Sequence, residues 1–338
     1  MWSIPYPPGR WSGTHFYTRR VFLTKGPRVF VIVLNFRHPG DTIRCVASLR
    51  RSHEREIHPV VVNNESGGDD ADQLRHALGP AIPVLENSTN VGYAAGNNIG
   101  IRHALERDAD YVWILNPDTE IEPNALQLMM ATMTSRPDAG TVGTLNLVGG
   151  SSPPIIQFAG GRIDWGAGAI TESIGMGKPL TSRSRREPYD VDYVAGTSML
   201  VRRRVFDDVG VLPEQYFLYF EETDFQVRAA RKGWKSVMNP LAHVWHHQRS
   251  ATRLPAPYYT YYYVRGRMLF GKEFTDFSDD KLEEGLESFT DGWRSRVAEQ
   301  APDWMDTYDR LVEWALSDGR AGRTGPRREV DVMTGPGG

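Results

Sequence analysis

Short apolar runs alternate with helix-like stretches through the first half of the chain. Strand-like runs lie at residues 28–35, 58–64, 82–86 and 110–116, and helix-like stretches lie at 41–51, 70–78, 93–107 and 123–134. The first run is apolar and β-branched almost throughout, which is typical of a strand buried on both faces of a parallel sheet. The alternation predicts an α/β fold with a doubly wound sheet. We expect Asp41 to cap its helix and Pro123 to stand at the first position of another.

The second half of the chain is less regular and divides into regions. Residues 139–200 are rich in Gly, Ser and Pro, with strand-like segments at 155–158 and 191–201 and loop-like segments at 149–154 and 175–186. They are followed by a helix at 222–232, a strand at 235–238, a helical stretch after Pro257, and helices at 279–299 and 302–317. We therefore expect an irregular extension over 1–25, an α/β domain over 26–255, a helical region over 256–320 and a disordered tail over 321–338.

Composition excludes some partners and indicates a location. The sequence holds 39 Lys and Arg against 42 Asp and Glu, for a net charge of −3. A nucleic-acid-binding protein usually carries a basic surplus, so we expect no nucleic-acid partner. Cys45 is the only cysteine, so no internal disulfide can form, which fits a reducing cytoplasm. The apolar run at 29–34 is far shorter than the roughly 20 residues that span a bilayer, and we expect a cytoplasmic protein.

Polar side chains stand where the predicted strands end. Asn35 and Asn64 follow the first two strands, and residues 116–118 follow the fourth. In doubly wound sheets ligands bind beyond the carboxyl ends of the strands, so these side chains are candidate ligand contacts. A carboxylate such as Asp118, held just after a buried strand, suits a hard divalent cation that also binds phosphate oxygens. The alternative is that Asp118 lies in a proline turn and caps the next helix.

Three carboxylates crowd together behind an aromatic run at 216–220. They are Glu221, Glu222 and Asp224. Adjacent like charges are unfavourable unless they are solvated, paired or used in chemistry. One interpretation makes one of them a general base. The other makes them the acidic first turn of a surface helix, where the helix dipole favours negative charge.

Histidines follow Pro240 near the end of the α/β region. His243 and His246 stand three positions apart. Imidazole beside carboxylates suits Mn²⁺ better than Ca²⁺, so His246 is a candidate metal ligand. No cysteine partner and no His-Glu-x-x-His pattern accompanies them, which argues against zinc. The alternative is a packed or surface histidine without a ligand.

Small residues open the helix predicted at 93–107. The stretch 90–98 contains Asn90, Gly92, Gly96 and Asn97. Small residues let a backbone approach a ligand closely, and a helix N-terminus attracts phosphate. The stretch is neither a Gly-x-Gly-x-x-Gly motif nor a Walker loop. Tight packing of the helix on the sheet would explain it equally well.

These segments, taken together and in this order, resemble the family 2 inverting glycosyltransferases of GT-A fold, and among them the rhamnosyltransferase-like subgroup. The matching stretches are residues 29–35, 60–66, 90–100, 109–120, 191–203, 216–234, 240–250 and 258–270. Several matches in a fixed order are far more specific than any one. The resemblance implies a Rossmann-like, doubly wound mixed sheet with a C-terminal helical extension.

The resemblance also implies an activity. It implies transfer of a sugar, with inversion, from a UDP- or dTDP-sugar to an acceptor hydroxyl. The acceptor would be a glycan, a lipid-linked sugar or a small molecule, and the cofactor Mn²⁺ or Mg²⁺. A positioned base and a metal that neutralises the departing diphosphate carry such chemistry without a covalent nucleophile.

Implied roles fall on the positions that match the family's motifs. The donor-binding positions are Asn35, Asn63, Asn64, Asn90, Gly92, Gly96, Asn97, Asn116 and Asp118. Asp118 and His246 are implied as metal ligands, and Asn35 and Asn64 as contacts of the nucleobase. The catalytic group is implied to be Glu222 as base, Asp224 as its companion acid and Glu221 beside them. Asn63 and Glu222 each stand where aspartate is commoner in the family.

Two regions, residues 1–25 and 145–190, have no counterpart that we can assign in the family. We expect acceptor specificity to lie there or in the C-terminal helices. The aromatic run at 258–263, with Arg265 and Arg267 behind it, has two interpretations. It either packs in the core or rests on the inner face of a membrane near a lipid-linked acceptor.

Two other functions compete with glycosyl transfer. A GT-A-like sugar nucleotidyltransferase would need a Gly-rich, basic loop after the first strand, and residues 35–40 contain only one glycine. A non-catalytic carbohydrate- or partner-binding descendant of the fold is the second. The joint presence of Asp118, Glu222 and His246 argues against it.

Overall fold

A mixed sheet forms the centre of the α/β part. The computed structural model describes residues 26–54, 56–65, 68–181, 183–247, 254–333 and 335, so the extension expected over 1–25 lies outside it. The strands are β1 (Val29–Asn35), β2 (Ile57–Asn64), β3 (Val84–Asn87), β4 (Tyr111–Leu115), β5 (Thr119–Ile121), β6 (Ala139–Val148), β7 (Ile156–Phe158), β8 (Gly161–Asp164), β9 (Ile170–Ser173), β10 (Tyr189–Val191), β11 (Ser198–Arg202) and β12 (Lys235–His246). Their order across the sheet is β10-β12-β6-β11-β4-β1-β2-β3, with β5 on β12 and β7 on β6, while β8 pairs with β9.

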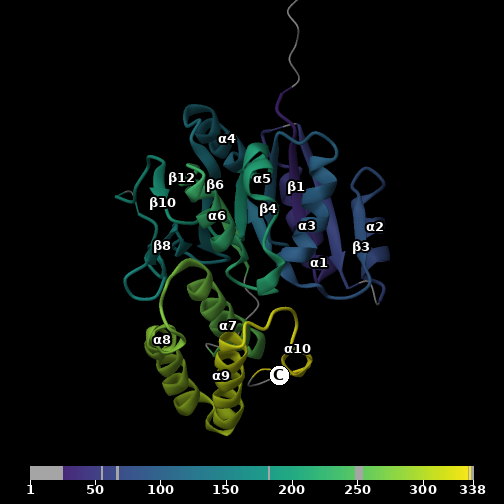
Figure 1. Ribbon diagram of the computed structural model, residues 1–338. Coiled ribbons are helices and arrows are strands. Elements are labelled where there is room, and N and C mark those ends of the chain that lie inside the picture. The colour runs from purple at the N-terminus through teal and green to yellow at the C-terminus, as the bar shows by residue number, and fades with distance from the viewer. Residues whose placement is uncertain are drawn as a thin grey trace, which may run out of the picture.

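Helices cover the sheet and form a second part below it (Figure 1). The helices of the α/β part are α1 (Pro39–Leu49), α2 (Asp70–Leu78), α3 (Gly92–Leu105), α4 (Ala125–Ser135), α5 (Arg203–Val209) and α6 (Glu221–Arg231), with a 3₁₀ turn η1 (Glu214–Tyr216). The lower helices are α7 (Pro257–Phe274), α8 (Asp279–Gln300), α9 (Met305–Arg320) and α10 (Arg328–Asp331), with a 3₁₀ turn η2 (Pro302–Trp304).

The pairing directions confirm the predicted doubly wound mixed sheet. β1 runs parallel to β2 and β4, and β2 runs parallel to β3. β11 lies antiparallel between β4 and β6, and β12 is parallel to β6. The carboxyl ends of β1, β2, β4, β6 and β12 therefore share one edge of the sheet. Ligands are expected beyond that edge.

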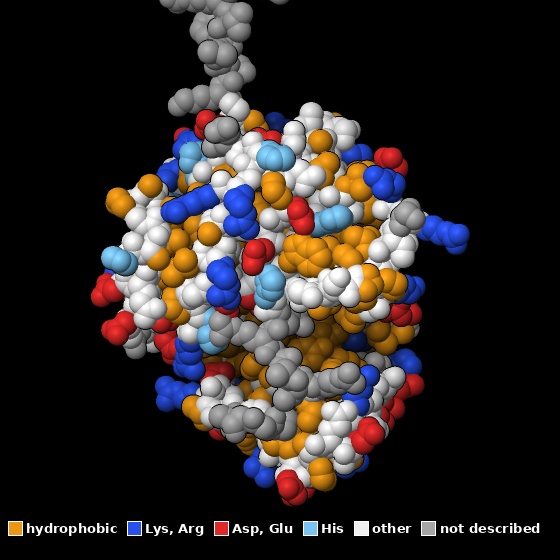
Figure 2. All heavy atoms as spheres, turned by 180° about the vertical axis from the view of Figure 1, so that it is seen from behind, with side chains coloured by type: hydrophobic (Ala, Val, Ile, Leu, Met, Phe, Trp, Pro, Cys, Tyr) orange, Lys and Arg blue, Asp and Glu red, His pale blue; other side chains and the backbone are white. Residues whose placement is uncertain are grey.

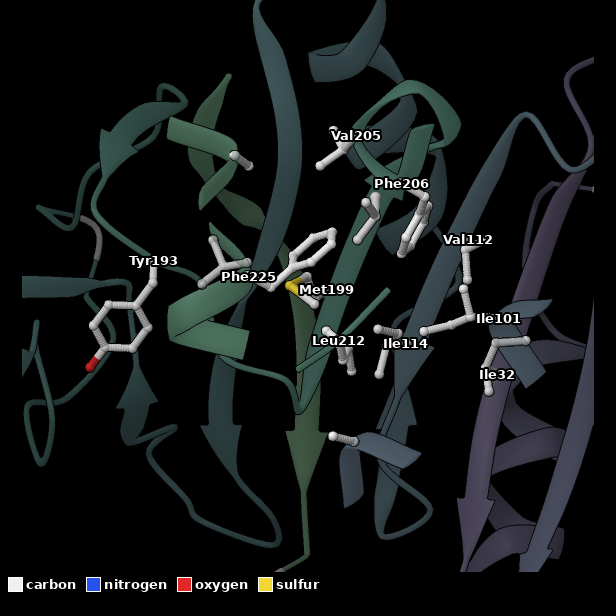
Figure 3. Packing of buried hydrophobic residues seen from close by; sticks show 14 of the residues in the cluster. Ile32, Ile101, Val112, Ile114, Tyr193, Met199, Val205, Phe206, Leu212 and Phe225 are labelled. Carbon is white, nitrogen blue, oxygen red and sulfur yellow. The ribbon is translucent and has the colours of Figure 1, made fainter. Parts of the chain in front are cut away.

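Apolar layers hold the helices on both faces of the sheet. On one face, Ile101 of α3 points toward Ile32 of β1 and Ile114 of β4 (Figure 3). Phe206 of α5 and Phe225 of α6 lie in the same cluster with ring centroids 5.4 Å apart. On the other face, α1 and α4 pack against β1, β4 and β12. The apolar runs expected as buried strands are thus covered on both sides.

Two helices begin at other residues than the sequence predicted. α1 begins at Pro39 with His38 as its N-cap, so Asp41 lies inside the first turn and is not the cap. Proline suits the first helical position because its φ is already helical, which explains the earlier start. Pro123 precedes the N-cap Asn124 of α4 and lies outside that helix.

Some strands differ from the predicted ones. β6 was not predicted from the sequence, because its glycines interrupt the apolar pattern. An added Cβ at Gly140 would lie 2.8 Å from Trp234, and one at Gly143 would lie 2.6 Å from Val194, so close packing explains both glycines. The strand predicted at 191–201 is the end of β10, a turn, and β11, while β12 continues past Met238 to His246.

The C-terminal region is more ordered than the sequence suggested. α10 lies within the tail expected to be disordered, and Val330 in it is 1% exposed. The Tyr262 hydroxyl donates to Asp331 Oδ1 at 2.8 Å, which holds α10 against α7. Tyr261, Tyr262 and Arg265 are buried, so α7 packs in the core as the first interpretation of its aromatic run stated. None of the helices in the described residues has the length and apolarity needed to cross a membrane.

Replacing Ile101 should test how strongly the sheet depends on α3. Ile101→Ala is expected to lower the free energy of unfolding by about 2–5 kcal/mol, because Ile101 is fully buried between α3 and the sheet. Urea unfolding measures this change. Ile99→Ala, in the same helix but only half-buried, is the matched control and should cost clearly less. Equal losses in the two variants would contradict the packing described here.

Candidate active site

Asp118 and His246 meet at the carboxyl edge of the sheet although they lie 128 positions apart. The chain leaves β4 at Leu115 and turns through Asp118 into β5, which pairs antiparallel with the end of β12. That pairing sets His246 opposite Thr119, and the backbone N–H of His247 donates to the carbonyl of Asp118 at 2.8 Å. As a result, His246 Nε2 lies 3.0 Å from Asp118 Oδ1.

The imidazole of His246 is oriented by Gln157 of β7. Gln157 Oε1 lies 2.7 Å from His246 Nδ1 and can only accept, so Nδ1 carries the proton. With the proton on Nδ1, Nε2 is the ring nitrogen that can bind a cation together with Asp118 Oδ1. A cation bound by both atoms would stabilise this arrangement. A metal-binding histidine commonly has such a partner on its other nitrogen.

The pair fits a divalent ion by its donor chemistry. One carboxylate oxygen and one imidazole nitrogen suit Mn²⁺, and the carboxylate also suits Mg²⁺. Their 3.0 Å separation is close to that of adjacent ligands in an octahedron with bonds of about 2.1 Å. Within the described residues, no three His, Cys, Asp or Glu side chains gather to hold an ion. The remaining ligands would be phosphate oxygens and water, as is usual for Mg²⁺.

His243 does not join this pair. It lies three positions before His246 on the same strand, where side chains alternate between the two faces. Its Nε2 lies 3.1 Å from the carbonyl of Pro240. The histidine spacing seen in the sequence therefore gives one candidate ligand rather than two.

Glu221 and Glu222 begin α6 behind a strained aromatic turn. Phe217, Tyr219 and Phe220 have positive φ values of 68°, 67° and 74°. Bulky residues rarely adopt this conformation, which costs about 1–3 kcal/mol each and persists where the surrounding structure imposes it. Such residues cluster at functional sites. Here they determine where α6 begins and hence where its two glutamates lie.

Glu221 is buried and Glu222 is half-buried, and each has one buried oxygen that lacks a hydrogen bond to the described residues. Oε2 of Glu221 and Oε2 of Glu222 have no hydrogen-bond partner among the described residues. Burial, and then the charge of Glu222, raise the pKa of Glu221 well above its ordinary value. Burial also raises the pKa of Glu222, although the N–H of Gly196 donates to its Oε1 at 3.4 Å. A carboxylate whose pKa is moved toward neutrality suits proton transfer with a hydroxyl.

Tyr93 connects the Asp118 loop with the glutamates. Its hydroxyl lies 3.0 Å from Asn116 Oδ1 and 2.9 Å from the carbonyl of Gly196, the residue whose N–H contacts Glu222. Burial raises the pKa of Tyr93, and the charges of Glu221, Glu222 and Asp118 raise it further. Tyr93 therefore links the loop that carries Asp118, through Asn116, with Gly196, whose N–H contacts the candidate base Glu222.

The site borders the C-terminal helices. Seen from behind, a hollow lies between the α/β part and the lower part, and acidic, histidine and basic side chains lie together on the α/β part above it (Figure 2). Tyr258, in the first turn of α7, is 50% exposed. Burial of its hydroxyl, and then the charge of Asp118, raise the pKa of Tyr258. The charge of Asp118 thus acts on a side chain in the first turn of α7.

Asp224 does not face this cluster as a free acid. Its side chain is fully buried, its Oδ2 accepts from the Tyr216 hydroxyl at 2.7 Å, and it forms an ion pair with Arg228. Arg228 in turn contacts Glu273 at the end of α7. Asp224 therefore fixes α6 against its surroundings. The role of companion acid, implied by the resemblance, has no support in these contacts.

The asparagines at the strand ends bind mainly to one another and to backbone. Asn35 Nδ2 donates to Asn63 Oδ1 at 2.7 Å, and the Thr42 hydroxyl donates to Asn35 Oδ1 at 2.8 Å. Asn64 Nδ2 donates to Asn90 Oδ1 at 3.0 Å, and its Oδ1 accepts from the N–H of Val91. These amides fasten the loops at the sheet edge. The Nδ2 of Asn63 is buried without a partner among the described residues.

The glycines before and within α3 serve close packing. An added Cβ at Gly92 would lie 2.4 Å from the carbonyl of Phe217, and one at Gly96 would lie 2.7 Å from Leu34. Gly92 also has a φ of 88°, which favours glycine. Asn97 Nδ2 donates to the carbonyl of Tyr93 at 2.9 Å, while its Oδ1 is buried without a partner among the described residues. Packing, the alternative weighed for this stretch, accounts for both glycines.

Tyr93, Gln157 and Gly196 were not predicted as site residues. Tyr93 lies within the stretch 90–98, in which only the glycines and asparagines were candidate ligand contacts. Gln157 lies in a short strand of a region without a counterpart in the family. The pattern of a lone tyrosine among small residues was the only indication that any of the three could have given.

Solved structures with the same fold are glycosyltransferases. GalNAc-T7 with UDP, GalNAc and Mn²⁺ aligns with a TM-score of 0.55 and 16% identity over 82% of this chain and 58% of that chain. The mannosyltransferase PcManGT from Pyrobaculum calidifontis, in complex with GDP-Man and Mn²⁺, aligns with a TM-score of 0.55 and 13% identity over 88% of each chain. These likenesses establish a GT-A fold, as the resemblance implied.

Sequence comparison gives the family. Residues 29–210 match the model of glycosyl transferase family 2. The N-acetylglucosaminyl-diphospho-decaprenol L-rhamnosyltransferase of Mycobacterium tuberculosis is 30% identical over 229 residues, which cover 63% of this chain and 74% of that protein. The low-salt glycan biosynthesis hexosyltransferase Agl10 of Haloferax volcanii is 28% identical over 269 residues, 78% of this chain and 82% of that protein. The chain belongs to glycosyl transferase family 2 and is a glycosyltransferase.

The raised pKa of Glu221 predicts how stability varies with pH. Between its ordinary pKa and the raised one, the folded protein holds a proton that the unfolded chain releases, so stability falls as pH rises through this range. Glu221→Gln should remove this loss. The free energy of unfolding of Glu221→Gln, measured with urea, should therefore rise relative to that of the unmodified protein between pH 5 and pH 9. Glu106→Gln, at an exposed position, should leave the pH dependence unchanged. An equally steep decline in Glu221→Gln would refute the burial argument.

Proposed function

We propose that this glycosyltransferase moves a sugar, with inversion, from a UDP- or dTDP-sugar to an acceptor hydroxyl with the help of a divalent ion. The convergence of Asp118, His246 and Glu222 around Tyr93 carries the proposal. The Mn²⁺ bound in the two structural neighbours supports a divalent ion. The sugar transfer named for the relatives supports a nucleotide-sugar donor.

Glu222 is the proposed general base. Its carboxylate takes the proton of the acceptor hydroxyl while the acceptor oxygen bonds to the anomeric carbon and the bond from that carbon to the diphosphate oxygen breaks. This single displacement inverts the anomeric centre and needs no covalent intermediate. Glu221 lies beside it, and burial and the charge of Glu222 raise the pKa of Glu221, which favours its uncharged form there. A positioned base of this kind contributes roughly 10²–10⁴-fold in rate.

Asp118 and His246 are the proposed holders of the divalent ion. Bound there, the ion supplies Lewis-acid stabilisation of the departing diphosphate. Gln157 keeps the imidazole in the tautomer that leaves Nε2 free for the ion. Tyr93, through Asn116 Oδ1, keeps the loop that carries Asp118 in place.

The acceptor is proposed to be a glycan, a lipid-linked sugar or a small molecule. The decaprenol in the name of the mycobacterial relative supports a lipid-linked sugar. The single buried cysteine supports a cytoplasmic location for the reaction. The same relative's lipid-linked acceptor also supports peripheral membrane contact, to which the aromatic run of α7 would offer only Tyr258 as an exposed ring.

Removing the metal ligand should abolish donor binding that depends on metal. In a thermal-shift screen of nucleotide sugars with Mn²⁺, at least one UDP- or dTDP-sugar should raise the melting temperature of the unmodified protein. Asp118→Ala should lose that shift, and so should the unmodified protein in EDTA. Asp306→Ala, at an exposed position in α9, should keep it. A full shift in Asp118→Ala would exclude the proposed metal site.

Replacing the base should separate binding from transfer. Glu222→Gln keeps the shape of the side chain but cannot accept the proton, so transfer should fall about 10²–10⁴-fold. Donor affinity should stay near that of the unmodified protein. Release of nucleotide diphosphate in the presence of acceptor measures the rate. Glu221→Gln is the matched control and should keep transfer within a few-fold. If Glu222→Gln retains more than a tenth of the rate, Glu222 is not the base.

A further inference from the structure

A large cavity among the described residues lies away from the candidate active site. It has a volume of about 980 Å³ and opens between β8, β10, the second half of α6, the start of β12 and the connection from α7 to α8. These elements lie together on one side of the molecule (Figure 1). Glu222 stands at the start of α6 and Arg231 at its end, so roughly 13 Å of helix separates the base from this groove.

Aromatic side chains line the groove from several elements. They are Trp165 after β8, Trp234 before β12, and Phe274 and Phe277 at the α7–α8 connection. Trp165 is 42% exposed, which makes it one of the few large apolar side chains that the described part of the chain leaves open to water. Phe270 supports its ring at a centroid distance of 6.1 Å. An exposed tryptophan at the mouth of a large groove indicates a ligand-binding surface.

The formal charges of the groove cancel. Its ionisable side chains are Arg162, Arg231, Lys235, Asp190, Asp192 and Asp276. Asp190 and Asp192 form ion pairs with Arg136 and Arg162. Within the described residues, Arg231, Lys235 and Asp276 form no ion pair. Beside the aromatic rings, Arg231 and Lys235 can therefore donate hydrogen bonds to a ligand, and Asp276 can accept them.

We propose that this groove binds a neutral oligosaccharide. Sugar rings present polarised C–H groups that suit the negative faces of aromatic rings, while their hydroxyls both donate to carboxylates and accept from Arg and Lys. A strongly anionic ligand would require a clear surplus of unpaired cations, which the groove lacks. Its volume is at the upper end of the roughly 300–1,000 Å³ typical of ligand sites, which favours several sugar units over one.

The position of the groove connects it with the acceptor. Trp165 comes from residues 145–190 and Phe274 and Phe277 from the C-terminal helical region, and these are the regions in which the sequence led us to expect acceptor specificity. An acceptor glycan held here would have a binding contact away from the reacting hydroxyl. This assignment as an acceptor subsite rests on the proposed function. Binding of the oligosaccharide itself does not.

Binding can be measured without donor and metal, which separates this proposal from the proposed function. The probes are neutral oligosaccharides of five to eight units built from glucose, mannose, galactose or rhamnose, titrated by isothermal calorimetry. At least one should bind the full chain. Trp165→Ala should weaken its affinity about tenfold or more, because tryptophan side chains that contact a ligand often carry a large share of the binding energy. Trp165→Phe, which keeps a ring, should retain most of it.

Two controls place the binding site. Met176→Ala, which removes another exposed apolar side chain of the same region without touching the groove, should bind as the unmodified protein does. Asp118→Ala should also bind normally, because the groove is separate from the metal pair. The proposal is overturned if no probe binds, if Trp165→Ala binds unchanged, if Met176→Ala loses affinity equally, or if Asp118→Ala abolishes binding.

Discussion

The pairing of β5 with the end of β12 is the constraint on which the site depends. This short antiparallel ladder joins segments far apart in the chain and sets Asp118 and His246 3.0 Å from each other. Gln157 of β7 holds the other ring nitrogen, and β7 itself pairs with β6, the neighbour of β12. The candidate metal pair is therefore built from the backbone pairing of the sheet, which positions side chains more precisely than loops do.

A second set of contacts fixes the acid groups relative to that pair. Tyr93 lies between Asn116 and Gly196, so the loop after β4 and the turn before β11 keep one geometry. Asp224, held by Tyr216 and by its ion pair with Arg228, anchors the helix that begins with the two glutamates. Both carboxylate oxygens of Asp224 have partners, whereas Glu221 and Glu222 each keep one oxygen without a partner among the described residues. That contrast separates a supporting carboxylate from those free to react.

Much of this arrangement could be predicted from the sequence, and the reasons for the failures are physical. The apolar runs predicted the strands because burial on both faces demands apolar residues at every position. Asp118 and His246 were visible as residue types that suit a divalent ion. The hydroxyl of Tyr93 and the amide of Gln157 act through partners far away in the chain, so no local pattern marks them. Asn35 was expected at the nucleobase, yet polar residues at strand ends also satisfy buried loop groups, as Asn35 does with Asn63.

The central claim is that one ion can bind Asp118 and His246 together beside Glu222. The most direct test is a crystal structure with Mn²⁺ and UDP or dTDP, using anomalous scattering at the manganese edge. The account predicts a single strong peak within bonding distance of Asp118 and of His246 Nε2, with diphosphate oxygens completing the coordination. A bound nucleotide whose manganese contacts neither side chain, or a peak at another surface, would contradict it.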